Sequence, residues 1–257
     1  KNLIPVILIT GLIILGVFLY NQDASKTEKS ADNQIKIGII LGFTGPIESL
    51  APVMAKSAEL AIDEVNKSGN FMDGAQLMAV RADSTCVDAA AAQAAAERLI
   101  TSDKVSAIMG ADCSGVTTAV LKNVAIPNGI LMISPSATSP ALSTEPDNDL
   151  FFRTAPSDAR QGEVIADLLM EKGFKTAALT HTNNDYGKGL AASIKSNYEA
   201  KGGTITITAS HEDGKGDYSS EVAALAQASG DILIVAGYLD QGGKGIIQAS
   251  LDSDAFN

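Results

Sequence analysis

Residues 35–46, IKIGIILGFTGP, decide the fold, because an apolar strand runs into a turn containing Gly and Pro, and an amphipathic helix follows at residues 52–67. The same unit recurs along the chain. We expect strands at residues 35–41, 76–82, 105–109, 130–133, 176–179, 204–208 and 232–235, and helices at residues 52–67, 87–100, 116–124, 159–171, 189–201, 218–228 and 241–250. Strands rich in Ile, Val and Leu that alternate with helices indicate parallel sheets covered on both faces. The sequence therefore predicts an α/β protein with doubly wound sheets.

One polar stretch interrupts this alternation. Residues 144–149, TEPDND, are typical of turns, and residues 151–154, FFRT, return to an extended pattern. We expect the chain to cross there between two lobes, with lobe 1 at residues 35–154 and lobe 2 at residues 155–257. Since the pattern stops after a helix, we expect lobe 2 to be incomplete in this chain.

The N-terminal residues have a different composition from the rest. Residues 3–20, LIPVILITGLIILGVFLY, are almost uniformly apolar, and polar residues follow. Such a run is typical of an export signal or a membrane anchor, so we assign residues 1–22 to one of these and residues 23–34 to a linker. Either interpretation predicts a periplasmic or other extracytoplasmic location, with the N-terminal segment inserted in the membrane at least transiently and residues 3–20 as a possible tether.

Composition excludes several classes of function. Lys and Arg number 19 and Asp and Glu 30, which gives a formal charge of −11, so the basic surface of a nucleic-acid-binding protein is absent. Aromatic residues make up 5% and there is no Trp, which disfavours a base-stacking platform. Two Cys and two His leave little for metal chemistry, so we predict neither a metal site nor a cofactor.

The two cysteines, Cys86 and Cys113, allow two interpretations. In an oxidising compartment a disulfide is favoured, and closure of a loop of this length would stabilise the fold by roughly 3–4 kcal/mol. The alternative is a pair of reduced thiols in the core.

Polar and glycine-rich clusters follow four of the expected strands. They are GADCSG at residues 110–115, SPSAT at residues 134–138, HTNNDYG at residues 181–187 and AGY at residues 236–238. Ligands of open parallel sheets bind outside the carboxyl ends of the strands. Because these clusters come from both halves of the chain, we expect them to meet in a cleft between the lobes.

The side chains in these clusters suit a small zwitterion. Ser114 begins an expected helix, where backbone N–H groups favour an anion. Ser136 and Thr138 add hydroxyls, and carbonyls of their loop could accept hydrogen bonds from an ammonium group. Tyr186 and Tyr238 each offer a flat apolar ring with a polar tip. Ordinary turn and capping chemistry is the alternative explanation for any single cluster.

Catalytic motifs are missing from the sequence. The glycines between residues 38 and 45 lack the dinucleotide-binding spacing, and residues 237–245, GYLDQGGKG, lack the first glycine and the Ser or Thr of a phosphate-binding loop. Ser114 is not in a G-x-S-x-G motif. We interpret His181 as a strand-end residue and His211 as a surface-loop residue, so we do not expect an enzyme.

The chain from residue 35 onward resembles the periplasmic leucine/isoleucine/valine-binding proteins, which are the substrate-binding proteins of branched-chain amino-acid ABC transporters. The combination of DCSG with SPSAT is the most specific part of this resemblance. The matching stretches are IKIGIILGFTGP at residues 35–46, AELAIDEVNKSG at 58–69, MISPSATSPAL at 132–142, FRTAPSDARQG at 152–162, NDYGKGLA at 184–191 and GDYSSEVAAL at 216–225, together with Cys86 and Cys113.

The resemblance implies a type I periplasmic-binding-protein fold, with two α/β lobes that close on a ligand, and a disulfide between the two cysteines. It implies that Ser114 and Thr138 hold the ligand carboxylate. It also implies that the Thr138 hydroxyl and the backbone of Ser136, Ala137 and Thr138 contact the ammonium. Tyr186 and Tyr238 would close over the ligand from lobe 2.

Two features of the resemblance leave the ligand open. Some relatives carry an aromatic residue in the first loop, for which we assign Leu50 here. Relatives that bind amino acids usually supply an acidic partner for the ammonium further along than residue 257, because the rest of their fold returns to lobe 1. On this basis we expect a receptor that delivers a branched-chain or other aliphatic amino acid to an ABC permease in the inner membrane. The alternatives are a membrane-anchored sensor of the same fold and a receptor for urea or a short amide.

Overall fold

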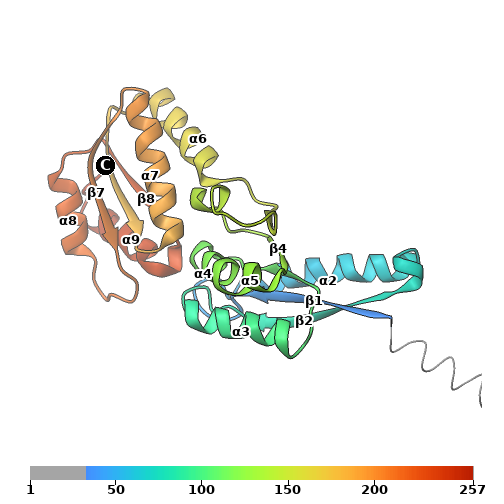
Figure 1. Cartoon of the computed structure of the whole chain (residues 1–257). Coiled ribbons are helices and arrows are strands. Elements are labelled where there is room, and N and C mark those ends of the chain that lie inside the picture. The colour runs from blue at the N-terminus through green and yellow to red at the C-terminus, as the bar shows by residue number, and fades with distance from the viewer. Residues whose placement is uncertain (1–32, 257) are drawn as a thin grey trace, which may run out of the picture.

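The computed structural model describes residues 33–256, which form two α/β units joined by a short connection (Figure 1). We call the unit that contains the first sheet lobe 1 and the unit that contains the second sheet lobe 2. The predicted export signal or anchor at residues 1–22 lies outside the described residues, as does most of the predicted linker.

Lobe 1 is built on a parallel sheet of five strands in the order β2-β1-β3-β4-β5. Apolar strands that run in the same direction need crossover connections, and helices supply them. The strands are β1 (Gln34–Leu41), β2 (Gln76–Asp83), β3 (Ala107–Gly110), β4 (Leu131–Ser134) and β5 (Phe151–Arg153). The helices are α2 (Ala51–Ser68), α3 (Ala89–Thr101), α4 (Ser114–Val120) and α5 (Ile126–Asn128), the last two joined through the π-helical turn Leu121–Ala125.

Local sequence accounts for the ends of these helices. The carboxylate of Asp88 accepts hydrogen bonds from two backbone N–H groups in the first turn of α3 and so caps the alanine-rich helix. Helix α2 begins with a proline in its first turn and ends at Gly69, which adopts the left-handed conformation with φ of 64°. The helices therefore begin and end where side-chain caps and glycine allow.

Lobe 2 is built on a parallel sheet of three strands in the order β7-β6-β8. Its strands are β6 (Thr176–Thr182), β7 (Thr204–His211) and β8 (Ile232–Ala236). Its helices are α6 (Asp158–Glu171), α7 (Asp185–Ala200), α8 (Ser219–Gln227) and α9 (Lys244–Asp252), the last preceded by the turn η4 (Leu239–Gly243). The predicted α/β fold with parallel sheets is confirmed.

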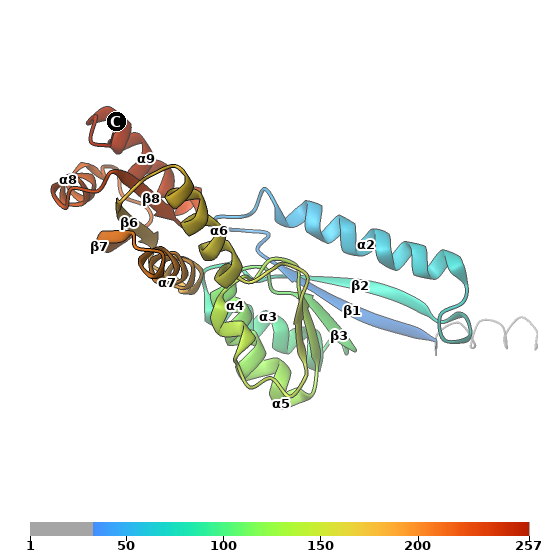
Figure 2. The same ribbon diagram turned by 90° about the horizontal axis from the view of Figure 1, so that it is seen from above.

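Buried apolar side chains cover both faces of each sheet. In lobe 1, α3 and α4 pack on one face, where Ile108 and Met132 are buried, and α2 packs on the other, where Ile39 is buried. Figure 2 shows this arrangement from above, with α2 on the opposite side of the strands from α3 and α4. In lobe 2, α6 and α7 cover one face and α8 and α9 the other. The layers hold the strand ends in fixed positions, as a site built on loops requires.

Helices α6 and α7 approach each other closely. A Cβ atom added at Gly162 would lie 2.6 Å from the backbone carbon of Ser193, so only glycine fits at this crossing. The contact matters for function because α6 begins directly after the connection from lobe 1 and α7 begins with residues expected in the cleft.

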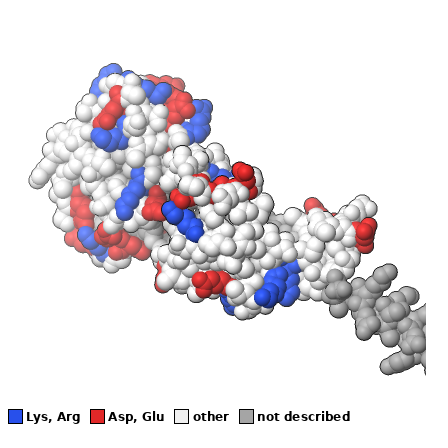
Figure 3. Space-filling model, in the orientation of Figure 1, with Lys and Arg blue, Asp and Glu red and all other residues white. Residues whose placement is uncertain are grey.

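Basic and acidic side chains are interspersed in small groups on the face of the molecule that Figure 3 shows. Between residues 33 and 256, no helix combines the length and the apolar character needed to span a membrane.

Candidate functional site

Loops at the carboxyl ends of strands from both lobes enclose a cavity of about 210 Å³. This volume is below the range of roughly 300–1,000 Å³ typical of pockets for drug-sized ligands, so the cavity suits a small solute. Five residues that the sequence predicted for ligand contact line it, namely Leu50, Ser136, Thr138, Tyr186 and Tyr238. The other lining residues are Ile47, Met54, Asp112, Cys113 and Gln161.

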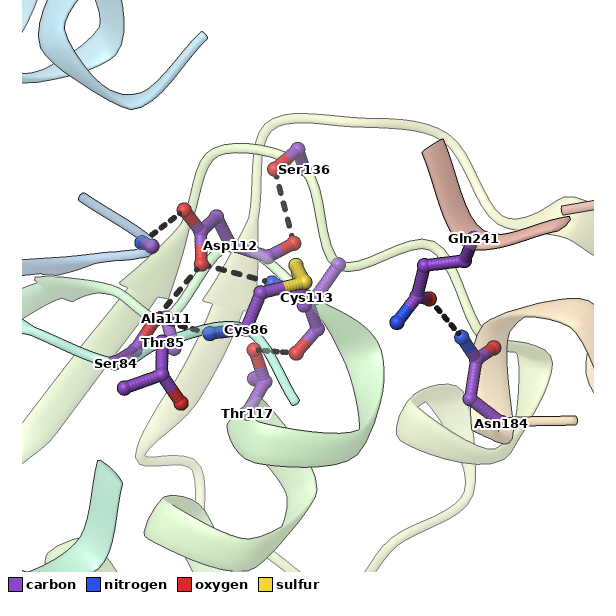
Figure 4. The surroundings of a disulfide bond; sticks show 12 residues. Ser84, Thr85, Cys86, Ala111, Asp112, Cys113, Thr117, Ser136, Asn184 and Gln241 are labelled. Atoms are coloured by element: carbon purple, nitrogen blue, oxygen red, sulfur yellow. Dashed lines mark hydrogen bonds between the residues drawn. A yellow bond between two sulfur atoms is a disulfide. The ribbon is translucent and has the colours of Figure 1, made fainter. Parts of the chain in front are cut away.

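The wall from lobe 1 is organised around Asp112, which follows β3. Its buried carboxylate accepts hydrogen bonds from the Gly42 N–H at 2.6 Å, the Ser84 hydroxyl at 3.1 Å and the Cys113 N–H at 3.0 Å. Its backbone carbonyl accepts a hydrogen bond from the Ser136 hydroxyl at 2.9 Å (Figure 4). Burial raises the pKa of Asp112, and these hydrogen bonds offset part of that effect. Asp112 thus ties the loops after β1, β2, β3 and β4 together.

The loop after β4 supplies the polar edge of the cavity. Thr138 lines the cavity, and its backbone carbonyl accepts a hydrogen bond from the Asp158 N–H at 2.9 Å. Within residues 33–256 the Thr138 N–H has no backbone acceptor. It is therefore available as a donor to a bound anion, while the Thr138 hydroxyl lies near the Asp158 carboxylate.

Two predicted residues lie behind the cavity wall. Ser114 is buried, and its hydroxyl oxygen accepts a hydrogen bond from the Ser139 N–H at 3.1 Å. Ala137 is also buried, with its N–H donated to the Ser134 hydroxyl at 2.9 Å and its carbonyl bound by Arg153 at 3.1 Å. In this arrangement both residues hold the loop that carries Thr138.

The wall from lobe 2 is a pair of tyrosines. Tyr186 lies in the first turn of α7 and Tyr238 follows β8, and their ring centroids are 4.8 Å apart with an interplanar angle of 37°. Burial raises the pKa of Tyr238 well above its ordinary value, and the neighbouring Tyr186, Asp112 and Asp158 add to this effect. Both phenols therefore stay neutral at physiological pH.

An apolar surface closes the end of the cavity next to α2. Ile47, Leu50 and Met54 contribute it, and Leu50 is 58% exposed despite its apolar side chain. A ligand that covered this surface would remove it from water, so an aliphatic group on the ligand fits here.

Asp158 is a candidate site residue that the sequence reasoning missed, although it does not itself line the 210 Å³ cavity. It is the first residue of α6, it is 1% exposed, and neither of its carboxylate oxygens has a hydrogen-bond partner in the described part of the protein. Burial raises its pKa, and the nearby Thr138 hydroxyl and Arg153 guanidinium offset this only in part. Its charge also raises the pKa of Tyr186 and Tyr238, so the carboxylate lies close to the cavity.

A sequence signal for Asp158 existed. The residue stands within FRTAPSDARQG, at the point where the chain was expected to cross between lobes. An acidic residue in the first turn of a helix has an ordinary explanation as a complement to the helix dipole. Burial without a partner distinguishes Asp158 from that case, and burial is not visible in a single sequence.

The predicted disulfide is present between Cys86 and Cys113, which lie 27 positions apart with Cα atoms 5.2 Å apart. It joins the loop before α3 to the residue that precedes α4. Figure 4 shows Asn184 and Gln241 of lobe 2 across from it, joined by a hydrogen bond of 2.9 Å. These residues surround a second cavity of about 380 Å³, which shares Cys113, Tyr186 and Tyr238 with the first.

The interpretation of His211 as a surface-loop residue was wrong. It is the last residue of β7 and is 1% exposed, because β7 extends three residues beyond the predicted strand and carries the histidine under the β8–α9 loop. His181 lies near the end of β6, as expected. Across residues 33–256, no cluster of three or more His, Cys, Asp or Glu side chains could hold a metal ion.

Comparison with known proteins gives consistent matches. The family model described as periplasmic binding protein matches residues 34–250. The chain is 33% identical over 214 residues to Leu/Ile/Val-binding protein homolog 3 of Brucella melitensis, covering 81% of this chain and 56% of that protein. It is 31% identical over 220 residues to the leucine-, isoleucine-, valine-, threonine-, and alanine-binding protein of Pseudomonas aeruginosa, covering 85% and 58%.

A solved structure agrees with these sequence relatives. The branched-chain amino acid transporter substrate binding protein LivJ of Streptococcus pneumoniae, in complex with isoleucine, matches with a TM-score of 0.73 and 30% identity, over 87% of this chain and 62% of that one. The chain spans less than two thirds of the length of each of these relatives. The predicted type I periplasmic-binding-protein fold is confirmed, and the chain belongs to the periplasmic binding protein family.

Proposed function

We propose that the protein is an extracytoplasmic receptor that captures a small aliphatic amino acid between its lobes and presents it to an ABC permease. The buried Asp158 carboxylate carries this proposal, because neither of its oxygens has a hydrogen-bond partner in the described residues and the nearby Arg153 offsets its burial only in part, so a further positive charge beside it would be favourable. A ligand ammonium group would supply that charge.

The remaining walls of the cavity fit the other parts of an amino acid. The Thr138 hydroxyl and N–H are suitable donors to the ligand carboxylate. The apolar surface of Ile47, Leu50 and Met54 would receive an aliphatic side chain, whose full burial is worth roughly 1.5–3 kcal/mol. The tyrosine pair would cover the ligand from lobe 2.

Electrostatics favour an amino acid over a simple organic acid. Asp112 is the charged residue that lines the cavity, and Asp158 lies beside it, so the surrounding charge is negative. A ligand with a carboxylate and no ammonium would add a third negative charge beside Asp112 and Asp158, whose hydrogen bonds and the nearby Arg153 offset their burial only in part, and this is unfavourable in a desolvated site. The relatives whose names include leucine, isoleucine and valine support the same ligand class.

Calorimetric titration of the full chain with L-leucine and two analogues tests the proposal. The analogue 4-methylpentanoate lacks the ammonium group and 3-methylbutylamine lacks the carboxylate. We expect L-leucine to bind and both analogues to bind at least tenfold more weakly, because each leaves one polar group of the site unpaired. Urea, acetamide and 4-hydroxybenzoate complete the panel. Tighter binding of any of these three than of every aliphatic amino acid would replace the proposed ligand class.

A further inference from the structure

A buried polar cluster lies beneath the tyrosine pair in lobe 2. Nδ1 of His211 is 2.9 Å from the Thr180 hydroxyl, and Nε2 is 3.3 Å from the Thr182 hydroxyl. All three side chains are less than 5% exposed. The two threonines lie on β6 and the histidine on β7, so the cluster joins neighbouring strand ends.

Thr182 connects this cluster to both tyrosine-bearing loops. Its hydroxyl oxygen accepts a hydrogen bond from the Tyr238 N–H at 3.2 Å, and its carbonyl accepts one from the Asn184 N–H at 2.8 Å. Asn184 caps α7, whose first turn carries Tyr186. A Cβ atom added at Gly237 would lie 1.9 Å from the Thr182 hydroxyl oxygen, so this close approach depends on glycine.

We propose that His211 is a positioning residue for the ligand site, which holds Tyr238 through Thr182, and that protonation of His211 weakens ligand binding. This inference rests on the proposed function. His211 does not line the 210 Å³ cavity and acts through the hydrogen-bonded chain from its ring to the backbone of Tyr238.

The hydrogen-bond capacity of the ring supplies the mechanism. In neutral imidazole one nitrogen donates and the other accepts. One threonine hydroxyl therefore donates to the ring and the other accepts from it, in either tautomer. Protonation turns the accepting nitrogen into a donor, so the hydroxyl that donated to it loses its acceptor in a buried position. The cluster must then rearrange, and the Thr182 hydroxyl is the group that holds Tyr238.

The groups around His211 lower its pKa below the ordinary value for histidine, so its protonation occurs at a lower pH. Burial lowers the pKa of His211 and the neighbouring His181 lowers it further, while Glu212 and Glu221 act in the opposite direction. The Tyr218 phenol packs on the same β8–α9 loop from the start of α8. His211 also lines the 380 Å³ cavity, which provides a route for water and protons. Affinity should be full above about pH 6.5 and fall as the pH drops through the lowered pKa.

Titrations with L-leucine between pH 7.5 and 5.0 test the proposal on the full chain. Wild type should lose about tenfold more affinity across this range than His211→Gln, which keeps a hydrogen-bonding group and cannot titrate. Asp158 is present in both proteins, so its own titration cancels in the comparison. His181→Gln serves as the comparison variant: it should keep a pH-dependent profile, with the midpoint moved to higher pH because His181 lowers the pKa of His211. Equal profiles for wild type and His211→Gln would overturn the proposal.

An NMR titration of the ligand-free wild-type protein tests the positioning role without relying on a ligand or on the folding of a His211 variant. The sequence contains two histidines, so the His181→Gln control assigns both imidazole resonances in NMR spectra. The Tyr238 backbone amide should shift with the same midpoint as the His211 ring. If the chemical shift of the Tyr238 amide does not change as His211 titrates, the positioning role is refuted. If L-leucine does not bind wild type at pH 7.5 while the amide shift occurs, the proposed ligand is wrong and the positioning role of His211 stands.

Discussion

Replacement of Asp158 by Asn should weaken ligand binding and stabilise the ligand-free protein, and the opposite signs of these effects make the prediction specific. Asn keeps the size of the side chain and removes its charge. Hydrogen bonds to a charged group contribute about 1.5–3 kcal/mol, so the affinity for L-leucine should fall roughly 10- to 150-fold. The ligand-free protein should gain on the order of 1 kcal/mol, because a buried carboxylate without hydrogen-bond partners is replaced by a neutral amide.

The pH dependence of stability follows from the raised pKa of Asp158. The folded ligand-free protein holds its proton more tightly than the unfolded chain, so this group lowers stability as the pH rises from about 3.9 through the raised pKa. Asp158→Asn removes that contribution. The stability difference between variant and wild type should therefore be full at neutral pH and disappear in acid.

Calorimetry measures the affinity, and chemical denaturation of the ligand-free protein at pH 7.5 and pH 4 measures the stability. Asp185→Asn is the matched control, because Asp185 is the first residue of α7 as Asp158 is of α6, but its side chain is exposed. The control should change neither quantity by more than a few tenths of a kcal/mol. Unaltered affinity in Asp158→Asn, or a loss of stability at pH 7.5, would refute the reasoning.

Two further predictions concern the framework of the site. The double substitution of Cys86 and Cys113 by Ser should lower the free energy of unfolding by about 3–4 kcal/mol, because the disulfide closes a loop with a sequence separation of 27. Equal denaturation midpoints of the wild type with and without reductant would contradict this. Gly237→Ala should lower stability by about 1–3 kcal/mol and weaken L-leucine binding, because the new Cβ would collide with the Thr182 hydroxyl. Gly216→Ala is the control, since its added Cβ meets nothing within 4 Å, and equal losses in both glycine variants would argue against the collision.

Periodicity predicted most of the strands and helices, because buried parallel strands and amphipathic helices leave strong local patterns. Their ends were less accurate: β7 ends at His211 and not at residue 208, and α7 begins at Asp185 and not at residue 189. The tyrosine pair and Thr138 were predicted because they stand directly after strands, where parallel sheets bring their loops together. The sequence also predicted that they meet in a cleft, and all three line the 210 Å³ cavity.

Burial explains why the environment predicted for His211 was wrong. His211 looked like a polar loop residue, but β7 extends to it and two threonine hydroxyls satisfy its ring. Ser114 stays a predicted ligand contact, and its hydroxyl oxygen accepts a hydrogen bond from the Ser139 N–H. Asp158 was not singled out from the sequence, because only its burial distinguishes it from an ordinary acid near a helix start. Whether a polar side chain supports a loop or faces a ligand depends on three-dimensional neighbours, which a single sequence does not specify.

Under the proposed function, the position of Asp158 would also link ligand selection to lobe closure. It is the first residue of α6, the helix that follows the connection from lobe 1 (Figure 1). A ligand can favour the closed state only by the extra free energy that it gains there. An amino acid gains contacts with the tyrosine pair and also neutralises the buried charge. A ligand without an ammonium group would gain the contacts with the tyrosine pair alone. It would leave the Asp158 carboxylate without an ammonium partner in a closed site from which water is excluded. Discrimination therefore increases as the lobes close, because a missing hydrogen-bond partner costs most where water is excluded.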